Sequence, residues 1–190
     1  MRYSKTHKEE TRRKLLDSSR ALVKKGGFDT TGVEALMSSI GLTPGAFYTH
    51  FPSKQALLEE VLREEMQYSV SLFDPGADHD VDALRLRIRA YLSSAHAQHP
   101  EIGCVLAAMG AELGRTPPAA KAIIEHGLEQ LHDVAQAELK DSNAAWAMIS
   151  QCVGAVILSR AVTSDAKRSE ILRANRAHID ALLDSLTKTD

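Results

Sequence analysis

Residues 31–54 read TGVEALMSSIGLTPGAFYTHFPSK, and this stretch decides the fold. Its first half has apolar residues at helical spacing, which predicts a short helix with one apolar face. These residues are Val33, Leu36, Met37 and Ile40. We expect the Thr31 hydroxyl to cap the free N–H groups at the helix start. Gly41 suits the left-handed residue that ends many helices.

A second short helix is predicted directly after this turn. Thr43 can cap its start, and a proline such as Pro44 is favoured in a first helical turn. Phe47 and Phe51 lie four residues apart and are expected to face inward, and Pro52 ends the helix. The side chains left to face outward or sideways are those of Gly45, Ala46, Tyr48, Thr49 and His50.

A third helix is predicted to begin at Lys54, with Ser53 as its cap. A cation and free backbone amides then meet at one helix start, which suits a phosphate group. Two short helices around a tight turn, followed by this third start, form a helix-turn-helix. The stretch therefore indicates a DNA-binding protein.

The residues before this stretch support the same interpretation. A helical apolar stripe ends at Gly26–Gly27, and Phe28 is expected to enter the three-helix core. The stripe consists of Leu15, Leu16, Ser19, Leu22 and Val23. Arg12, Arg13 and Lys14 are interpreted as solvated charges on the outer face of this helix, with a contact to DNA as the alternative. Residues 1–54 hold ten Lys or Arg against five Asp or Glu, and the remainder holds 13 against 20, so DNA is expected at the basic part.

Several of these positions together resemble the DNA-binding signature of TetR/AcrR-type transcriptional regulators. They are Gly27–Phe28, Thr31, Gly41–Thr43, Gly45, Phe47–Tyr48, His50–Phe51 and Ser53–Leu57. The resemblance covers about the first 60 residues. It implies an all-helical homodimer with a divergent C-terminal ligand domain, and repression that a small molecule relieves. Leu36–Met37 departs from the pair usual in the family, at packing positions.

The resemblance assigns DNA-binding roles to nine residues. Tyr48 and His50 match the pair that contacts the DNA backbone, and Lys54 matches the phosphate contact. The alternatives are that Tyr48 covers an apolar edge and that Lys54 is an ordinary solvated lysine. The positions that we expect to reach base edges are Thr43, Pro44, Ala46 and Thr49. Thr31 is also counted among the DNA-binding residues. Gly45 has no Cβ and is expected to allow close approach of the duplex. Arg2, Tyr3 and Lys5 are expected to form an arm that enters the minor groove.

Composition limits the class of protein. With 190 residues and 44% apolar content the chain can bury a substantial core. It has no run of about 18 apolar residues and no signal-like start, so we expect a cytoplasmic protein without membrane contact. Cys104 and Cys152 are too few for a disulfide framework or a structural zinc site, and no cofactor is indicated. His96 and His99 beside Cys104 lack the carboxylates of a metal site.

The remaining pattern predicts an all-α fold of about nine helices. We expect a helix-turn-helix domain over residues 1–54, with its boundary inside the helix that starts at Lys54, and a helical ligand-binding and dimerisation domain over residues 55–190. The helices expected after the turn-helix unit span about 54–73, 81–99, a short one from Cys104, 118–139, 144–163 and 167–187.

The helix over residues 144–163 is more apolar than one face requires, so a second subunit is expected to cover it. The resemblance implies a four-helix dimer interface made by the last two helices. The expected contacts are Ile149, Val153, Gly154, Ile157, Ile179 and Leu182. The alternative is a wholly intramolecular core.

A ligand pocket is expected among the helices between residues 81 and 160. Its lining would be Tyr91, Leu106, Met109, Leu113, Ile124, Leu128, Trp146 and Met148, each of which is otherwise plain core. Cys104 would join it, because a thiol in a first helical turn favours the thiolate and could sense electrophiles. The alternative is that Cys104 is a small buried residue.

These expectations combine into a DNA-binding regulator. We expect a homodimeric repressor that a small hydrophobic or electrophilic molecule releases from a palindromic double-stranded operator. A ligand-independent DNA-binding protein is the first alternative. An enzyme is the second, and it finds little support because no nucleophile elbow, phosphate-binding glycine loop or paired carboxylate motif occurs.

Overall fold

The computed structural model describes residues 5–28, 30–74, 76 and 80–186, and within them every regular element is helical. Nine α-helices and three short 3-10 helices (η) are found in this part of the chain. They are α1 (Lys5–Gly26), α2 (Val33–Ser38), η1 (Pro44–Thr49), α3 (Lys54–Ser71), α4 (Val81–Tyr91), α5 (Ser94–Gln98), η2 (Pro100–Ile102), α6 (Val105–Met109), η3 (Gly110–Arg115), α7 (Pro118–Leu139), α8 (Ser142–Arg160) and α9 (Asp165–Leu186). The predicted fold class is confirmed.

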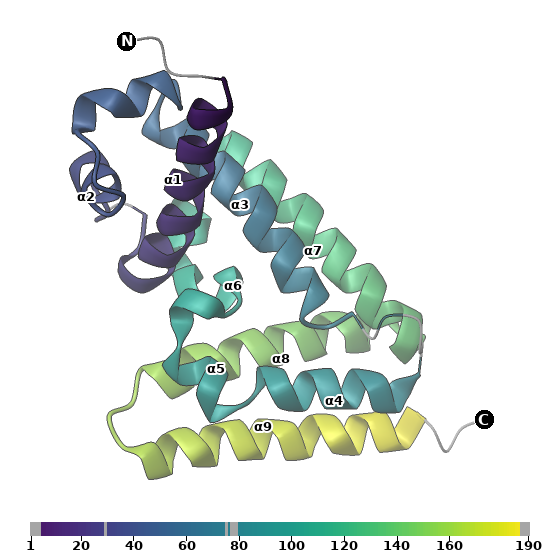
Figure 1. The fold of residues 1–190 in the computed structure, drawn as a ribbon. Helices are drawn as coiled ribbons and strands as arrows, with labels where there is room; N and C mark the ends of the chain where they lie inside the picture. Colours follow the sequence, from purple (N-terminus) through teal and green to yellow (C-terminus); the bar gives the residue numbers. More distant parts are fainter. Residues whose placement is uncertain (1–4, 29, 75, 77–79, 187–190) are drawn as a thin grey trace.

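The helices form two packed groups that share α3 (Figure 1). At one end α1 and α2 pack with η1 and the start of α3. At the other end α4, α8 and α9 lie side by side, and α7 runs along α3. Leu57 and Val61 of α3 belong to the small core beneath η1, whereas Leu58, Leu62 and Met66 belong to the large core. One helix therefore connects the two cores rigidly.

The small core contains the residues that the sequence pattern predicted, with two exceptions. Its members are Leu15, Leu16, Leu36, Met37, Phe47, Phe51, Leu57 and Val61. Phe28 was expected in this core and Val23 was assigned to the same stripe, but both pack in the large core with Leu58 and Leu62. The prediction for Phe28 was wrong because the chain after Gly27 turns toward α6 and η3 rather than toward η1.

Three helix limits differ from the sequence prediction. The helix expected over residues 81–99 is divided into α4 and α5, because the Ser93 side chain accepts the His96 N–H and starts a new helix. The short helix begins at Val105, with Cys104 as its N-cap. The helix expected from Ala144 begins at Ser142, because the Asp141 carboxylate accepts the first free N–H groups.

The antiparallel hairpin of α8 and α9 is present, but its side chains divide differently from the prediction. Ile149 and Ile179 are buried inside the subunit, at 3% and 0% exposure, so they are corrected from dimer contacts to intramolecular core. Val153, Gly154 and Leu182 are partly buried. Ile157 is 38% exposed, and Leu158, which the prediction omitted, is 59% exposed.

By length and composition, α8 could cross a membrane, and it is the one such helix in the described part of the chain. It packs against α5, α6, α7 and α9 within the subunit. Its buried apolar residues belong to the large core, whereas Ile157 and Leu158 stay exposed.

Candidate nucleic-acid interface

The turn between α2 and η1 is built as the sequence predicted. Gly41 has a φ of +72°, the left-handed region that glycine adopts without strain. The Leu42 N–H then donates to the Met37 carbonyl over 2.9 Å, which closes the end of α2. Phe47 and Phe51 are buried at 0% and 2% exposure, with ring centroids 6.0 Å apart. The predicted inward orientation of both rings is confirmed.

The second short helix is a 3-10 helix rather than an α-helix. Its six residues from Pro44 to Thr49 have Thr43 as the N-cap, although the Thr43 side chain makes no capping hydrogen bond. This tighter helix carries the exposed face that the sequence predicted for base contacts, and Thr43, Pro44, Gly45 and Thr49 are all exposed. Ala46 is partly buried against the small core. Their base contacts stay predictions.

Thr49 and Gly45 show how this face is arranged. The Thr49 hydroxyl donates to the Ala46 carbonyl over 2.7 Å, so its oxygen faces out as an acceptor. A Cβ on Gly45 would meet no atom within 4 Å, so glycine is not required there by the protein itself. The close approach of the duplex at Gly45 stays a prediction.

Tyr48 and His50 flank the exposed face. Tyr48 is 66% exposed, and its ring packs edge-on against Phe47 with centroids 5.3 Å apart. His50 is half-buried, and its Nδ1 is buried without a hydrogen-bond partner among the described residues. Burial lowers the pKa of His50, and the charges of Lys8, Arg12 and His7 act in the same direction. Its imidazole is therefore neutral at pH 7, and an approaching phosphate would favour its protonated form.

Lys54 starts α3 as predicted, and the predicted Ser53 cap is confirmed by a 3.0 Å hydrogen bond from the Ala56 N–H. The Lys54 ammonium is neither solvated nor free. It donates to the Phe28 carbonyl over 2.6 Å and lies 4.2 Å from the centroid of the Phe28 ring. Its phosphate contact stays a prediction, and the structure adds a positioning partner that the sequence pattern did not indicate.

The predicted cap by Thr31 was wrong. Gly32 is the N-cap of α2 and has no side chain to donate or accept, while the Thr31 hydroxyl donates to the Gly27 carbonyl over 2.6 Å. Thr31 is 8% exposed, so its role as a DNA contact has no structural support. Of the predicted minor-groove arm, Arg2 and Tyr3 lie outside the described residues.

Basic residues of α1 lie beside an acidic row on α3. Arg12 forms an ion pair with Glu60 and lies 4.5 Å from the Phe51 ring centroid. Arg13 pairs with Asp17 over 3.1 Å and with Glu64 over 3.0 Å. The Arg12 and Arg13 side chains are still 40% and 57% exposed, and Lys14 is exposed, so these charges are solvated as interpreted, with ion-pair partners that the sequence pattern did not indicate.

A buried ion pair lies deeper between the same helices. Glu65 of α3 is fully buried, its Oε1 accepts a hydrogen bond from Arg20 Nε over 2.5 Å, and its Oε2 forms an ion pair with the Lys24 ammonium at 2.9 Å. Lys24 also donates to the Gly103 carbonyl over 3.1 Å. Removing one partner of such a group would leave an uncompensated buried charge. The pair therefore fixes α1 to α3 and to the segment before α6.

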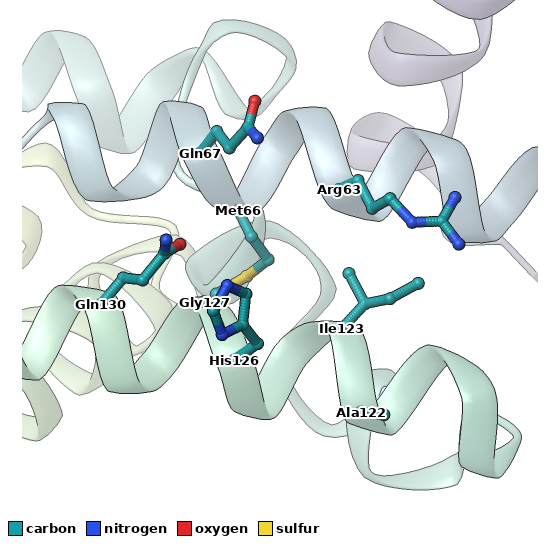
Figure 2. Close-up of a pocket in the computed structure, with 8 residues that line it drawn as sticks. All are labelled: Arg63, Met66, Gln67, Ala122, Ile123, His126, Gly127 and Gln130. Atoms are coloured by element: carbon teal, nitrogen blue, oxygen red, sulfur yellow. The ribbon is translucent and has the colours of Figure 1, made fainter.

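The predicted ligand residues do not form one site. Leu113, Ile124, Leu128 and Trp146 line an open groove of about 490 Å³ together with Gly114, Lys121, Glu125 and Glu129. Tyr91, Cys104, Leu106, Met109 and Met148 are instead buried in the large core, at 6% exposure or less. A second groove of about 340 Å³, which no sequence pattern indicated, lies between α3 and α7 (Figure 2). Ligand binding stays a prediction.

Cys104 lies in a polar cluster inside the large core. Its backbone N–H donates to His96 Nε2 over 3.0 Å, and His96 Nδ1 pairs with the Tyr91 carbonyl over 2.6 Å. Both ring nitrogens thus have backbone partners, and burial lowers the pKa of His96. Burial and the neighbouring Cys104 raise the pKa of Tyr91 well above its usual value. Cys104 is fully buried, and the five-residue helix behind it is too short for the dipole effect expected from the sequence.

Comparisons with known proteins agree with this geometry. Residues 15–61 match the family model described as bacterial regulatory proteins, tetR family. The chain is 28% identical over 68 residues to the HTH-type transcriptional regulator UidR of Escherichia coli strain K12, covering 36% of this chain and 35% of that protein. It is 33% identical over 64 residues to the HTH-type transcriptional repressor KstR of Rhodococcus jostii, covering 34% and 30%.

These sequence matches span about a third of the length of the curated relatives. Solved structures extend the likeness to the whole fold. A TetR transcriptional regulator from Chloroflexus aurantiacus superposes with a TM-score of 0.77 at 20% identity, covering 96% of each chain. The similarity in sequence is therefore confined to the helix-turn-helix region, whereas the helical architecture is shared throughout.

Proposed function

We propose, because this chain belongs to the TetR family of bacterial regulatory proteins, that it is a homodimeric transcriptional repressor that binds a palindromic DNA operator in the cytoplasm. The observation that carries the proposal is the exposed face of η1 on a fully buried aromatic support. Phe47 and Phe51 hold the helix, while Thr43, Pro44 and Thr49 stand exposed beside Tyr48. A helix presented in this way can enter the major groove.

Affinity and sequence preference are divided between different residues. Tyr48, His50 and Lys54 supply contacts to the DNA backbone, which carry no sequence information. Thr43, Pro44, Ala46 and Thr49 reach base edges and thymine methyl groups. Residues 1–54 act as the DNA-binding domain, and the helical remainder binds ligand and dimerises.

The dimer forms through α8 and α9. The exposed Ile157 and Leu158 and the open surface at Gly154, where a Cβ would meet no atom within 4 Å, support this face. A two-fold axis there presents two copies of η1 to one duplex, and a separation of about 34 Å matches one turn of DNA.

A small hydrophobic molecule releases the repressor from its operator. The groove lined by Leu113, Ile124, Leu128 and Trp146 supports an apolar ligand at the junction of η3, α7 and α8. An electrophile that reacts with Cys104 is the second route, and the burial of the thiol means that the core would have to open first. A DNA-binding protein without ligand control remains the alternative function.

The test is selection of operator sequences from a randomised DNA library, followed by fluorescence anisotropy with the recovered duplex. We expect a palindrome, and Lys54→Ala should weaken binding to all sequences and reduce the salt slope by about 1 per subunit. Thr49→Ala should change preference at particular base pairs instead. Failure to enrich any sequence would contradict the proposal. Enrichment with no release by hydrophobic compounds or electrophiles would favour the ligand-independent alternative.

A further inference from the structure

The Phe28 backbone joins two parts of the chain that are far apart in sequence. Its N–H donates to the Glu112 carboxylate of η3 over 2.7 Å. Its carbonyl accepts from the Lys54 ammonium over 2.6 Å. The Phe28 ring is anchored in the large core at 8% exposure. One residue, held by its buried ring, thus connects η3 with the first residue of α3 through its two backbone polar groups.

The residue before Phe28 is shaped for this contact. Gly27 has a φ of +84°, and a Cβ at this position would lie 2.7 Å from Glu112 Oε2. Any other side chain would therefore be strained and would also push the carboxylate away. Glycine at position 27 allows the Glu112 side chain to lie directly against the backbone.

Lys54 gains a defined position from the same residue. A lysine side chain loses rotamer entropy when it is fixed. The Phe28 carbonyl and ring already hold the ammonium, which uses one of its three N–H donors in that hydrogen bond. Two donors remain for a phosphate at the start of α3, so part of the ordering cost is met before DNA arrives.

Glu112 lies next to the groove at η3. The two residues that follow it, Leu113 and Gly114, line the groove beside Trp146. A molecule in the groove that shifts η3 would move the Glu112 carboxylate away from Phe28. Two hydrogen bonds, from the Phe28 N–H to Glu112 and from Lys54 to the Phe28 carbonyl, therefore connect the groove with the start of α3.

We propose that Glu112 is a positioning residue for DNA binding. It fixes the Phe28 backbone through the Phe28 N–H, and the Phe28 carbonyl in turn fixes the Lys54 ammonium where it can bind a phosphate. The proposal rests on the proposed DNA-binding function and names how the C-terminal part of the chain controls it. Loss of the Glu112 contact frees the Phe28 backbone, and the Lys54 ammonium then binds phosphate from a disordered state. DNA affinity falls for every sequence, because a phosphate contact is affected.

The test is a double-mutant cycle read by anisotropy on a duplex of unrelated sequence at low salt, so that no operator needs to be known. Glu112→Ala should weaken binding about fivefold with little change in the salt slope, because Lys54 still reaches the phosphate, whereas Lys54→Ala should weaken binding about tenfold and lower the salt slope by about 0.9 per subunit. The double variant should bind like Lys54→Ala alone, since Glu112 acts through the Lys54 contact. Glu112→Gln keeps an acceptor oxygen for the Phe28 N–H and should bind within twofold of the unchanged protein.

The matched control is Asp133→Ala, which removes one negative charge from an exposed residue of α7 outside the groove. It should leave the affinity unchanged or slightly higher. Equal losses from Glu112→Ala with and without Lys54 would overturn the proposal, because Glu112 would then act through the fold in general. The same conclusion would follow if Asp133→Ala matched Glu112→Ala.

Hydrogen exchange gives a readout that needs no DNA. The Phe28 amide should exchange faster in Glu112→Ala than in the unchanged protein or Glu112→Gln, while amides of the small core such as Phe51 keep their protection. If the unchanged protein bound no DNA, the proposed function would fall, and an unaltered Phe28 exchange rate would separately overturn the role of Glu112.

Discussion

The small core beneath η1 and the large core around α8 are filled by different kinds of side chain. The eight buried members of the small core carry no side-chain nitrogen or oxygen, and its two phenylalanines are wholly buried, although the neighbouring His50 and Gln55 each bury a nitrogen without a hydrogen-bond partner among the described residues. The large core includes the buried Tyr91 hydroxyl, near the Cys104 and Cys152 thiols and Arg160. A thiol is a weak hydrogen-bond partner, so this polar cluster is poorly satisfied.

This difference teaches which part of the molecule can change its packing. An apolar core with complementary shapes has one favoured arrangement, and a surface built on it keeps its geometry. A core with poorly satisfied polar groups gains more from a rearrangement that supplies partners. The DNA-facing surface therefore lies on the rigid part, and ligand response is expected from the adaptable part.

The largest expected effect comes from removing the support of η1. Phe47→Ala deletes a fully buried ring and should lower the free energy of unfolding by about 3–5 kcal/mol, because a cavity remains. Urea denaturation followed by circular dichroism measures the change. Tyr48→Ala is the matched control, since its ring is 66% exposed, and it should cost less than about 1 kcal/mol. Comparable losses from both variants would show that the small core is not the rigid part.

A smaller effect is expected where α3 crosses α7. Met66 of α3 reaches toward Gly127 of α7 in Figure 2, and a Cβ at position 127 would lie 2.6 Å from the Met66 Cε and 2.7 Å from its Cβ. Gly127→Ala should therefore destabilise the protein by about 1–3 kcal/mol. Differential scanning calorimetry measures the loss.

Gly154→Ala provides the matched control for that change. It also places a Cβ on a helical glycine, but in a position where no atom lies within 4 Å. The subunit should gain about 0.5–1 kcal/mol from the lower entropy of the unfolded chain. A stability gain together with a weaker dimer in sedimentation equilibrium would place Gly154 at the subunit interface. A loss in Gly154→Ala equal to that in Gly127→Ala would remove the distinction between the two sites.

The sequence predicted most of the small core because its residues carry local signals. Pro44 and Ser53 mark helix starts through their own backbone or side-chain chemistry, and the structure places an element boundary at each, whereas α2 already ends at Ser38, three residues before Gly41. Phe47 and Phe51 follow from spacing alone. The predicted cap by Thr31 was wrong because Gly32 takes the N-cap position, and the Thr31 hydroxyl donates to the Gly27 carbonyl instead.

Contacts between distant parts of the chain were not predictable in this way. Nothing local indicates that Glu112 meets Phe28 or that Glu65 meets Lys24, because neither spacing nor composition encodes which helices become neighbours. The same limit explains why Ile149 was placed on the outer face of α8. An apolar helix shows that it is covered on several sides but not by which partner.

The smallest expected effect concerns pH and His50, which lies beside the exposed face of η1. Burial lowers the pKa of His50 from its usual value of 6.5, and Lys8, Arg12 and His7 act in the same direction. The folded state then binds fewer protons at this site than the unfolded state, so the free energy of unfolding falls as pH drops below about 6.5 and is unaffected at higher pH. His50→Gln should remove this part of the pH dependence in urea titrations at pH 7.5 and 5.5.

Bound DNA should have the opposite effect on the His50 pKa, because a phosphate favours the imidazolium. The affinity for DNA should therefore rise toward pH 5.5 in the unchanged protein and rise less in His50→Gln. An equal rise in affinity in both proteins would show that the proton is taken up by a group other than His50, and His50 would then not be a pH-dependent DNA contact.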